Sequence, residues 1–224
     1  MPPTTARQVL PTDLLALVSY NGRNYPNEAW TRERLGSAEA SNPGLGIALD
    51  SFLSFARGRN AWVSVRRQRL NGLVGARPRG SRQAWELDYL VDATAQRETV
   101  PGLLDCAAAD VGRGGGEKLF VRLQTDCDLL PVVQRAGFIA FREDLLYARV
   151  GISTADGQTS LRPMTPGDSY QAFRLYNATT PESTRRNEAA TFNEWHAAQE
   201  RRWLRGGVSL VSEHNGPLSP GRRG

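Results

Sequence analysis

The chain has 224 residues, of which 40% are hydrophobic and 23% are charged, and its formal net charge is +5. This composition is that of a globular protein long enough to bury a core without disulfides, so it excludes a wholly disordered chain. No run of 18 apolar residues and no secretory signal is present, which excludes a membrane-spanning helix and leads us to expect a cytoplasmic protein.

The first half of the chain predicts one strand, a helical region and then three strands. Apolar alternation gives a strand over 6–10, after which Thr12 and Asp13 offer N-cap oxygens to a helix. A second helical region is expected within 27–56. The three strands that follow lie at 61–65, 73–76 and 83–91. Asn71-Gly72 is a strong signal for a hairpin turn, and we expect it to join the first two of these strands.

Strict alternation along 83–91 predicts which side chains share a face of the sheet. One face is expected to carry Trp85, Leu87, Tyr89 and Val91. The other face is expected to carry Glu86, Asp88 and Leu90.

The next segment predicts a helix, a strand and a second helix. Pro101 suits the first turn of a helix, and Gly112–Gly116 ends it. The apolar positions at helical spacing are Leu103, Leu104, Ala107, Ala108 and Val111. A strand is expected over 118–123, then a helix capped by Asp126 or Asp128 that runs through Arg135 and ends at Gly137 in the left-handed conformation. Two final strands, at 139–141 and 144–150, complete an α/β domain over 1–150.

A polar, glycine-containing linker is expected over 151–160, and a repeat follows it. Adding 155 to the residue number carries Arg7 to Arg162, Pro11 to Pro166 and Asp13 to Asp168. Further along, Val63-Ser64-Val65 recurs as Val208-Ser209-Leu210, and Asn71-Gly72 as Asn215-Gly216. The shared order of elements favours duplication over chance, with an incomplete second copy over 161–216. Its uncovered apolar helix faces predict packing on the first domain or a homodimer, and 217–224 is expected to be a disordered tail.

The cysteines, histidines and basic residues do not indicate a metal site or a nucleic-acid partner. The two cysteines and two histidines are too few and too scattered for a zinc site, so we expect no metal. Lys118 is the only lysine among 28 basic residues, and the arginines are dispersed over distant segments. A nucleic-acid partner is therefore disfavoured, because such binders gather basic residues on one face with aromatics between them.

The strand, loop and helix at 84–111 are more informative, because a helix that begins after a strand presents backbone N–H groups to a phosphate. With this segment, the chain resembles the GNAT superfamily of acyl-CoA-dependent N-acyltransferases. The resemblance covers about residues 5–150. It rests on the element order, the Leu90-Val91-Asp92 strand exit, the loop that follows and the Ala136-Gly137-Phe138 ending. It implies a mixed, mostly antiparallel sheet flanked by helices, and acetyl-CoA as co-substrate.

The resemblance also implies the residues that bind the co-substrate. The backbone of Leu90, Val91 and Asp92 would bind the pantetheine arm, and the following loop would bind the pyrophosphate. The family's loop reads Gln/Arg-x-x-Gly-x-Gly/Ala. Here the positions are Gln96, Arg97, Glu98, Thr99, Val100 and Pro101, followed by Gly102. Gln96 matches, whereas Thr99 and Pro101 replace the small residues, Pro101 removes an N–H donor and Glu98 adds negative charge. Gly102 restores some room one position later.

Family members often use a carboxylate on the strand before this loop as the general base, and Glu86 matches that position. Asp88 is a second candidate. The family's tyrosine acid falls at Val133, and its asparagine falls at Asp126. The resemblance therefore implies an N-acetyltransferase that moves an acetyl group to a primary amine, of which the acceptor is unknown. The alternative is a catalytically inactive GNAT-like binding or scaffold protein with a degenerate CoA loop.

Overall fold

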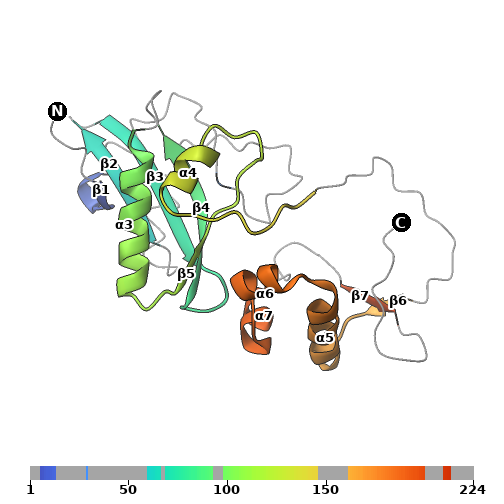
Figure 1. Ribbon diagram of the computed structural model, residues 1–224. Helices are drawn as coiled ribbons and strands as arrows, with labels where there is room; N and C mark the ends of the chain where they lie inside the picture. Colours follow the sequence, from blue (N-terminus) through green and yellow to red (C-terminus); the bar gives the residue numbers. More distant parts are fainter. Residues whose placement is uncertain are drawn as a thin grey trace, which may run out of the picture. The chain divides into compact units, whose positions relative to one another are not determined.

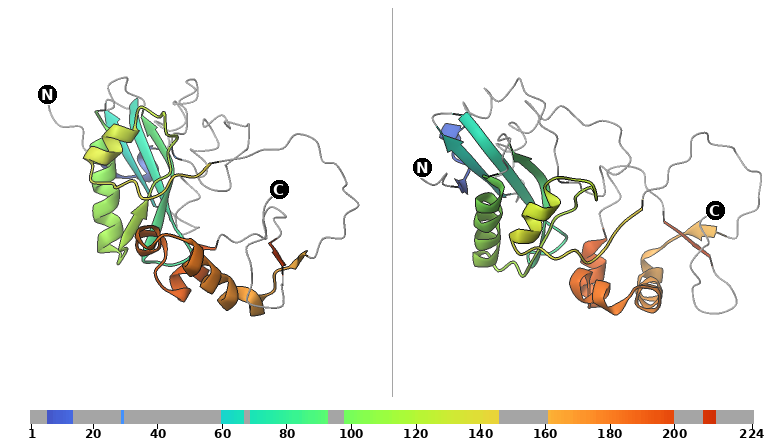
Figure 2. Two further views of the ribbon diagram at one scale, coloured as in Figure 1. Left: turned by 45° about the vertical axis from the view of Figure 1, so that its right-hand side comes forward. Right: turned by 45° about the horizontal axis from the view of Figure 1, so that its top comes forward.

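The computed structural model describes residues 6–13, 29, 60–66, 69–92, 98–145, 161–199 and 209–212. The chain divides into two compact units, Met1–Ala140 and Phe141–Gly224. Each is drawn in Figures 1 and 2 and is described by itself below. Among the helices of the described ranges, none has the length and apolar character needed to cross a membrane.

Unit 1 is built on a five-stranded sheet with the order β1-β2-β3-β4-β5. Its strands are β1 (Ala6–Gln8), β2 (Asn60–Arg66), β3 (Arg69–Pro78), β4 (Ala84–Asp92) and β5 (Lys118–Phe120). The pairs β1–β2, β2–β3 and β3–β4 are antiparallel, and β4–β5 is parallel. The expected mixed, mostly antiparallel sheet is confirmed.

Two helices pack on one face of this sheet, α3 (Val100–Arg113) and α4 (Leu130–Arg135) (Figure 1). The predicted stripe on α3 is buried except for Ala108, which is exposed. Trp62 of β2 lies under the helix with no exposed surface, and its indole Nε1 donates to Asp110 Oδ2 at 2.5 Å. This bond joins the buried strand to the helix surface, so it fixes where α3 lies along the sheet.

The opposite face of the sheet carries a second buried cluster. Its members are Val9, Ala61, Val63, Leu70, Leu73, Tyr89 and Val91. Gly75 belongs to this face, because a Cβ atom there would lie 2.1 Å from the Tyr89 ring. The glycine is needed because any side chain there would occupy the place of the Tyr89 ring.

The predicted hairpin turn at Asn71-Gly72 is wrong, because both residues lie inside β3. Ser64 is opposite Gly72 and Val65 is opposite Leu70, so Asn71 is the extra residue of a β-bulge. The β2–β3 ladder instead ends with Arg66 opposite Arg69. At Gly72 a Cβ atom would lie 2.8 Å from Leu103 Cδ1. The Asn-Gly pair thus serves a bulge and a close helix contact.

A second bulge changes which residues of β4 share a face of the sheet, so the predicted faces differ from the structure. Gly75 is opposite Tyr89 and Ala76 is opposite Leu87, which leaves Asp88 as the extra residue. The bulge reverses the alternation after Leu87. Leu87 and Leu90 therefore lie in the cluster under α3, and Tyr89 and Val91 lie in the cluster on the other face. The expectation that Leu87, Tyr89 and Val91 share one face is wrong.

The end of unit 1 follows the prediction only in part. α4 begins at Leu130 with Leu129 as N-cap and Pro131 in the first turn, so neither Asp126 nor Asp128 caps it. Gly137 has φ 89°, which confirms the left-handed ending. Gly137 N donates to Gln134 O and Phe138 N donates to Val133 O, which makes a Schellman motif.

Two predicted strands also differ from the structure. β5 ends at Phe120, earlier than expected, and 139–141 is not a strand; Ile139 is 85% exposed. Several other predicted features lie outside the described residues: the helices at 14–18 and 27–56 apart from Ala29, the end of the strand at 144–150, the linker, Asn215-Gly216 and the tail.

The described residues of unit 2 form a two-stranded antiparallel sheet and three short helices. Its elements are β6 (Leu161–Pro163), the 3₁₀ turn η4 (Pro166–Asp168), α5 (Ser169–Thr179), α6 (Glu182–Glu188), α7 (Phe192–Ala198) and β7 (Leu210–Ser212). Aromatic rings join α5 to α7, with Phe173 5.6 Å from Phe192 and 5.7 Å from Trp195 between centroids. This aromatic cluster is the described core of the unit.

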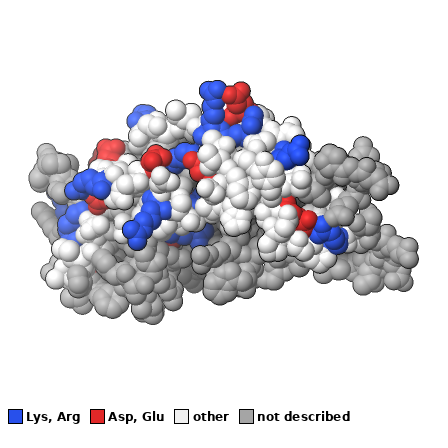
Figure 3. Space-filling view, turned by 90° about the horizontal axis from the view of Figure 1, so that it is seen from below, with Lys and Arg blue, Asp and Glu red and all other residues white. Residues whose placement is uncertain are grey.

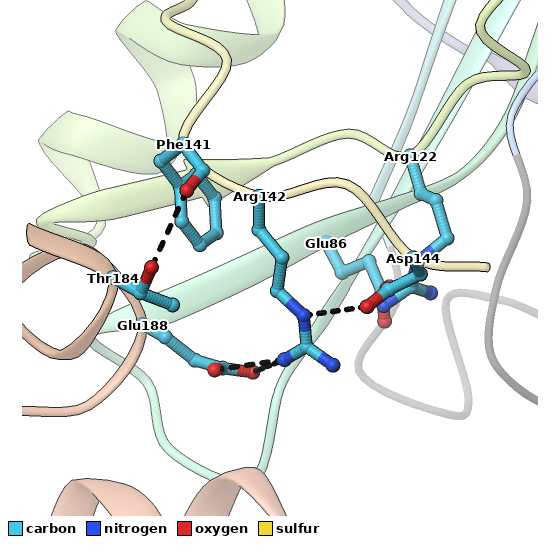
Figure 4. A network of polar contacts seen from close by, with 7 residues as sticks. All are labelled: Glu86, Arg122, Phe141, Arg142, Asp144, Thr184 and Glu188. Carbon is cyan, nitrogen blue, oxygen red and sulfur yellow. Dashed lines mark hydrogen bonds and ion pairs between the residues drawn. The ribbon is translucent and has the colours of Figure 1, made fainter. Parts of the chain in front are cut away.

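An arginine ties the start of unit 2 to α6. Arg142 Nη1 lies 3.1 and 3.0 Å from the carboxylate oxygens of Glu188, and Arg142 Nε donates to Asp144 Oδ1 at 2.5 Å (Figure 4). Thr184 Oγ1 donates to the carbonyl oxygen of Phe141 at 3.5 Å. Glu188 and Asp144 raise the pKa of the Arg142 guanidinium against the opposing effect of its burial. The segment 141–145 is thereby fixed to α6.

Candidate acyl-transfer site

The candidate site begins where β4 and β5 separate. The parallel pairing runs from Ala84 opposite Lys118 to Glu86 opposite Phe120 and then stops. Within the described residues, no strand pairs with Leu87–Asp92 on the side of β5. Parallel strands that diverge leave backbone N–H and C=O groups along the opening, where an extended ligand can take up their hydrogen bonds.

Hydrogen bonds clamp the two ends of the loop between β4 and α3 together. Asp92 ends β4, Thr99 precedes α3, and Thr99 Oγ1 donates to Asp92 Oδ1 at 3.2 Å. The same hydroxyl lies 3.4 Å from the carbonyl oxygen of Asn71. Asp92 and Thr99 are 4% and 6% exposed, so the clamp is internal. The side chain of Thr99 therefore points into the protein, away from the surface on which a pyrophosphate would lie.

The N-terminus of α3 lies directly after this clamp. Leu103 N donates to Thr99 O at 3.1 Å, which closes the first helical turn. The N–H groups of Val100 and Gly102 precede that bond, and Pro101 between them has none. A Cβ atom at Gly102 would meet no heavy atom within 4 Å, so the surface there is open. Glu98 is exposed beside it. The N-terminus of α3 suits an anion, but Pro101 leaves it with one backbone N–H donor fewer than a non-proline residue would give.

Glu86 lies between two arginines on the face opposite α3. Its Oε1 is 3.2 Å from Arg122 Nη1, and its Oε2 is 3.5 Å from Arg77 Nη2. The Glu86 side chain is 4% exposed, whereas the arginines are 20% and 18% exposed. Figure 4 shows Arg122 beside Glu86. Oε1 of Glu86 therefore accepts a hydrogen bond from Arg122, and Oε2 forms an ion pair with Arg77.

A further arginine extends this group. The Arg79 guanidinium carbon lies 4.9 Å above the ring of Phe120, the residue opposite Glu86. Arg79 is 9% exposed and its backbone N donates to Ala84 O at 2.7 Å. The described residues of this face thus bring Glu86 together with Arg77, Arg79 and Arg122. The sequence shows Arg77 and Arg79 as one of several arginine clusters, but it does not indicate that they meet Glu86 and Arg122.

Asp88, the other predicted base, is the bulged residue of β4 and is 3% exposed. The bulge separates it from the alternation that was expected to place it beside Glu86. Leu90 and Val91 are fully buried, each on a different face, so only their backbone can meet a ligand. Gln96 and Arg97 lie outside the described residues.

Two further residues near this site pack in or against the core. Val133, at the position of the family's tyrosine acid, is 2% exposed and packs in the core under α3. Burial is the main cause that raises the pKa of the Cys106 thiol on α3, which fits a packing role. Basic and acidic side chains are interspersed over the described part of the face in Figure 3.

Comparison with protein-family models and with curated proteins gave no match. Solved structures similar to this chain include the aminoglycoside 6'-N-acetyltransferase of Enterococcus faecium, at 21% identity and a TM-score of 0.35. That match covers 50% of this chain and 57% of that one, so the chain spans less than two thirds of that enzyme's length.

Two other similar structures match over more of their own length. One is AAC(6')-Iy in complex with the bisubstrate analogue CoA-S-monomethyl-acetylneamine, at 16% identity and a TM-score of 0.45. The match covers 65% of this chain and 97% of that one. The other is a Trypanosoma brucei acetyltransferase, at 18% identity, 64% and 98% coverage and a TM-score of 0.42.

Proposed function

We propose that unit 1 is a GNAT-type N-acetyltransferase of the cytoplasm that transfers an acetyl group from acetyl-CoA to a primary amine. The observation that carries the proposal is the separation of β4 and β5 after Glu86, which leads along Leu87–Asp92 to the N-terminus of α3. An extended pantetheine arm needs such a strand edge. A pyrophosphate needs such a helix end, where N–H groups and the helix dipole meet negative charge.

The residues present fit acetyl-CoA in its main parts. The backbone of Leu90, Val91 and Asp92 would hold the pantetheine arm, and the N–H groups of Val100 and Gly102 would hold the pyrophosphate. When bound, acetyl-CoA supplies the activated acetyl thioester. Pro101 and Glu98 weaken the cradle, the first by removing a donor and the second by adding negative charge. We therefore expect binding weaker than a loop of the family pattern would give.

Proton removal from the amine would be the task of Glu86 or Asp88. Glu86 lies at the last paired position before the strands separate, which favours it by position. Its Oε1, however, accepts from Arg122 and its Oε2 lies 3.5 Å from Arg77 Nη2, so an amine would have to approach a carboxylate that is flanked by two guanidinium groups. Asp88 lies two positions further into the opening.

A second candidate function is a non-catalytic binding or scaffold protein with the same fold. The buried Val133 in place of a tyrosine acid, the engaged Glu86 and Pro101 favour it. The two functions differ in turnover and share the fold. Binding of acetyl-CoA and release of its thiol therefore separate them.

Calorimetric titration of acetyl-CoA into the full chain tests the cradle. Pro101→Ala restores an N–H donor in the first turn of α3, and we expect acetyl-CoA affinity to rise by about 2- to 12-fold, the value of one net hydrogen bond. Pro131→Ala is the matched control, because Pro131 holds the same position in α4, which is not part of the proposed cradle. Equal gains in both variants, or no binding by the wild type, would contradict the cradle.

Thiol release with a panel of primary amines tests turnover. We expect Glu86→Gln or Asp88→Asn to lower the rate by about 10²- to 10⁴-fold with acetyl-CoA affinity unchanged, the range of a general base. Binding without thiol release for any amine would favour the scaffold function.

A further inference from the structure

We propose that residues 161–212 hold a second copy of the segment that opens unit 1: a strand, a 3₁₀ turn, an insert and a returning strand. The inference does not depend on the proposed function. It starts from the turn η1 (Pro11–Asp13) after β1. There Arg7 Nη1 and Nη2 each lie 2.7 Å from a carboxylate oxygen of Asp13, and Leu10 N donates to Asp13 Oδ2 at 2.8 Å. We call this set of bonds the Arg–Asp staple.

The same staple closes η4 in unit 2. Arg162 Nη1 and Nη2 lie 2.7 and 2.8 Å from the carboxylate oxygens of Asp168. Thr165 N donates to Asp168 Oδ2 at 2.8 Å, as Leu10 N does to Asp13. In both copies the arginine Nη1 also donates to the carbonyl oxygen of the next residue, at 3.0 Å to Gln8 and 3.2 Å to Pro163. A bidentate pair alone could recur by chance, whereas this set of bonds repeats atom by atom.

The returning strands carry the repeat beyond the turn. Arg7 is opposite Val63 in an antiparallel pair, and Arg162 is opposite Val211 in another. Past the strand end, Val9 N donates to Ala61 O at 3.0 Å, and Met164 N donates to Ser209 O at 2.7 Å. Val211 therefore corresponds to Val63, at an offset of 148 residues. The predicted match of Val63 to Val208 is wrong by three residues, because register follows the ladder and short valine motifs recur too easily.

One sequence difference between the two copies, a proline in β6, is compatible with the hydrogen-bond pattern of β1. Pro163 in β6 takes the place of Gln8 in β1. Gln8 is opposite Trp62, one position away from the bonded Val9–Ala61 pair, so its N–H points away from β2. A proline at this position removes no ladder bond, and prolines are tolerated there on edge strands. Gln8 and Pro163 can therefore occupy the same place in the two copies without a change in the backbone hydrogen bonds.

The duplication assigns α5, α6 and α7 a place in the fold. They lie between β6 and β7, as residues 14–59 lie between β1 and β2 in the chain. The described residues of unit 2 contain no counterpart of β4 or α3. The acetyl-CoA cradle proposed above is accordingly a property of unit 1.

The inference predicts that the two turn segments are interchangeable. Four substitutions, Gln8→Pro, Val9→Met, Leu10→Thr and Thr12→Gly, give residues 7–13 the sequence of residues 162–168. In the full chain we expect this exchange to keep cooperative unfolding, with a melting temperature within about 5 °C of the wild type. Amide hydrogen exchange of β1 and β2 should also be unchanged.

The matched control adds Asp13→Asn to the same four substitutions, which removes the carboxylate that closes the staple. We expect hydrogen exchange of the β1 and β2 amides to accelerate at least tenfold in this control alone. The reciprocal exchange, Pro163→Gln, Met164→Val, Thr165→Leu and Gly167→Thr, should leave β6 and β7 equally protected. Loss of protection in the first exchange as large as in its control, or a control protected like the wild type, would overturn the inference.

Discussion

The turns after β1 and after β6 have the same bonds and different surroundings. The arginine side chains are 41% exposed in both, and the aspartates are 6% and 14% exposed. The strands that they serve differ far more. Trp62 of β2 has no exposed surface under α3, whereas Leu210 at the corresponding place in β7 is 54% exposed. Hydrogen bonds within seven residues can thus close a turn beside an exposed strand, but burial of that strand needs layers from elsewhere in the chain.

The aspartates of the two turns share the direction of their pKa shift and differ by one hydrogen bond. The hydrogen bonds from Arg7 lower the pKa of Asp13, and those from Arg162 lower the pKa of Asp168. Asp168 also accepts from the Thr165 hydroxyl at 2.8 Å, a bond for which Leu10 in unit 1 has no group. The turn of unit 2 thus gains a local bond where unit 1 gains a packed core.

The largest expected effect concerns the corresponding strand positions. Trp62→Ala removes a fully buried indole and its bond to Asp110, so we expect the free energy of unfolding to fall by about 3–5 kcal/mol. Leu210→Ala removes a half-exposed side chain and should change it by at most about 0.5 kcal/mol. Urea unfolding of the full chain measures both. Similar losses in the two variants would show that β7 is as well covered as β2.

A smaller effect is expected from the staple of unit 1. Asp13→Asn leaves Arg7 and Leu10 N without the buried carboxylate that closes this partly exposed turn, and we expect a loss of about 1–3 kcal/mol at pH 7. Asp168→Asn is the matched variant in unit 2, and its effect on global unfolding should be smaller because none of the three residues of β7 is buried. Urea titration at pH 7 compares them.

The acid dependence of stability sharpens this comparison. Both aspartates have a folded-state pKa below the unfolded value of about 3.9, so the unfolded state binds protons first as the pH falls. The stabilisation is complete above that value and is lost as the pH falls through the folded pKa. The Asp13→Asn variant should therefore show a flatter loss of stability below about pH 4 than the wild type. Parallel acid curves would mean that other carboxylates cause the acid unfolding.

The smallest effect is expected at the tip of the second turn. Gly167 takes the place of Thr12, and a Cβ atom there would lie 3.8 Å from Thr165 Oγ1, an ordinary contact. Gly167→Ala should stabilise unit 2 by about 0.4–1 kcal/mol, because it lowers the entropy of the unfolded chain. Gly137→Ala is the opposite control, since φ 89° there disfavours a side chain. Destabilisation by Gly167→Ala, read from hydrogen exchange of unit 2, would mean that the two turns differ in backbone shape.

The sequence by itself determined the elements whose signals are local. Alternating apolar residues placed β2 and β4, Pro101 and the apolar stripe placed α3, and Gly137 marked the end of α4. The repeat of Arg7 and Asp13 at Arg162 and Asp168 was also legible, because the bonds that it encodes span seven residues. The resemblance of the loop after β4 indicated where to look for a site.

Only the tertiary structure decided which side chains meet. Bulges at Asn71 and Asp88 set the register of β3 and β4, and a bulge depends on the partner strand, so alternation along one strand cannot reveal it. The arginines that hold Glu86 come from β3 and from the chain beyond β5, and the Thr99 hydroxyl turns inward because Asp92 and Gly72 give it a place. These contacts join residues far apart in the sequence, and their energy exists only once the sheet and α3 have packed.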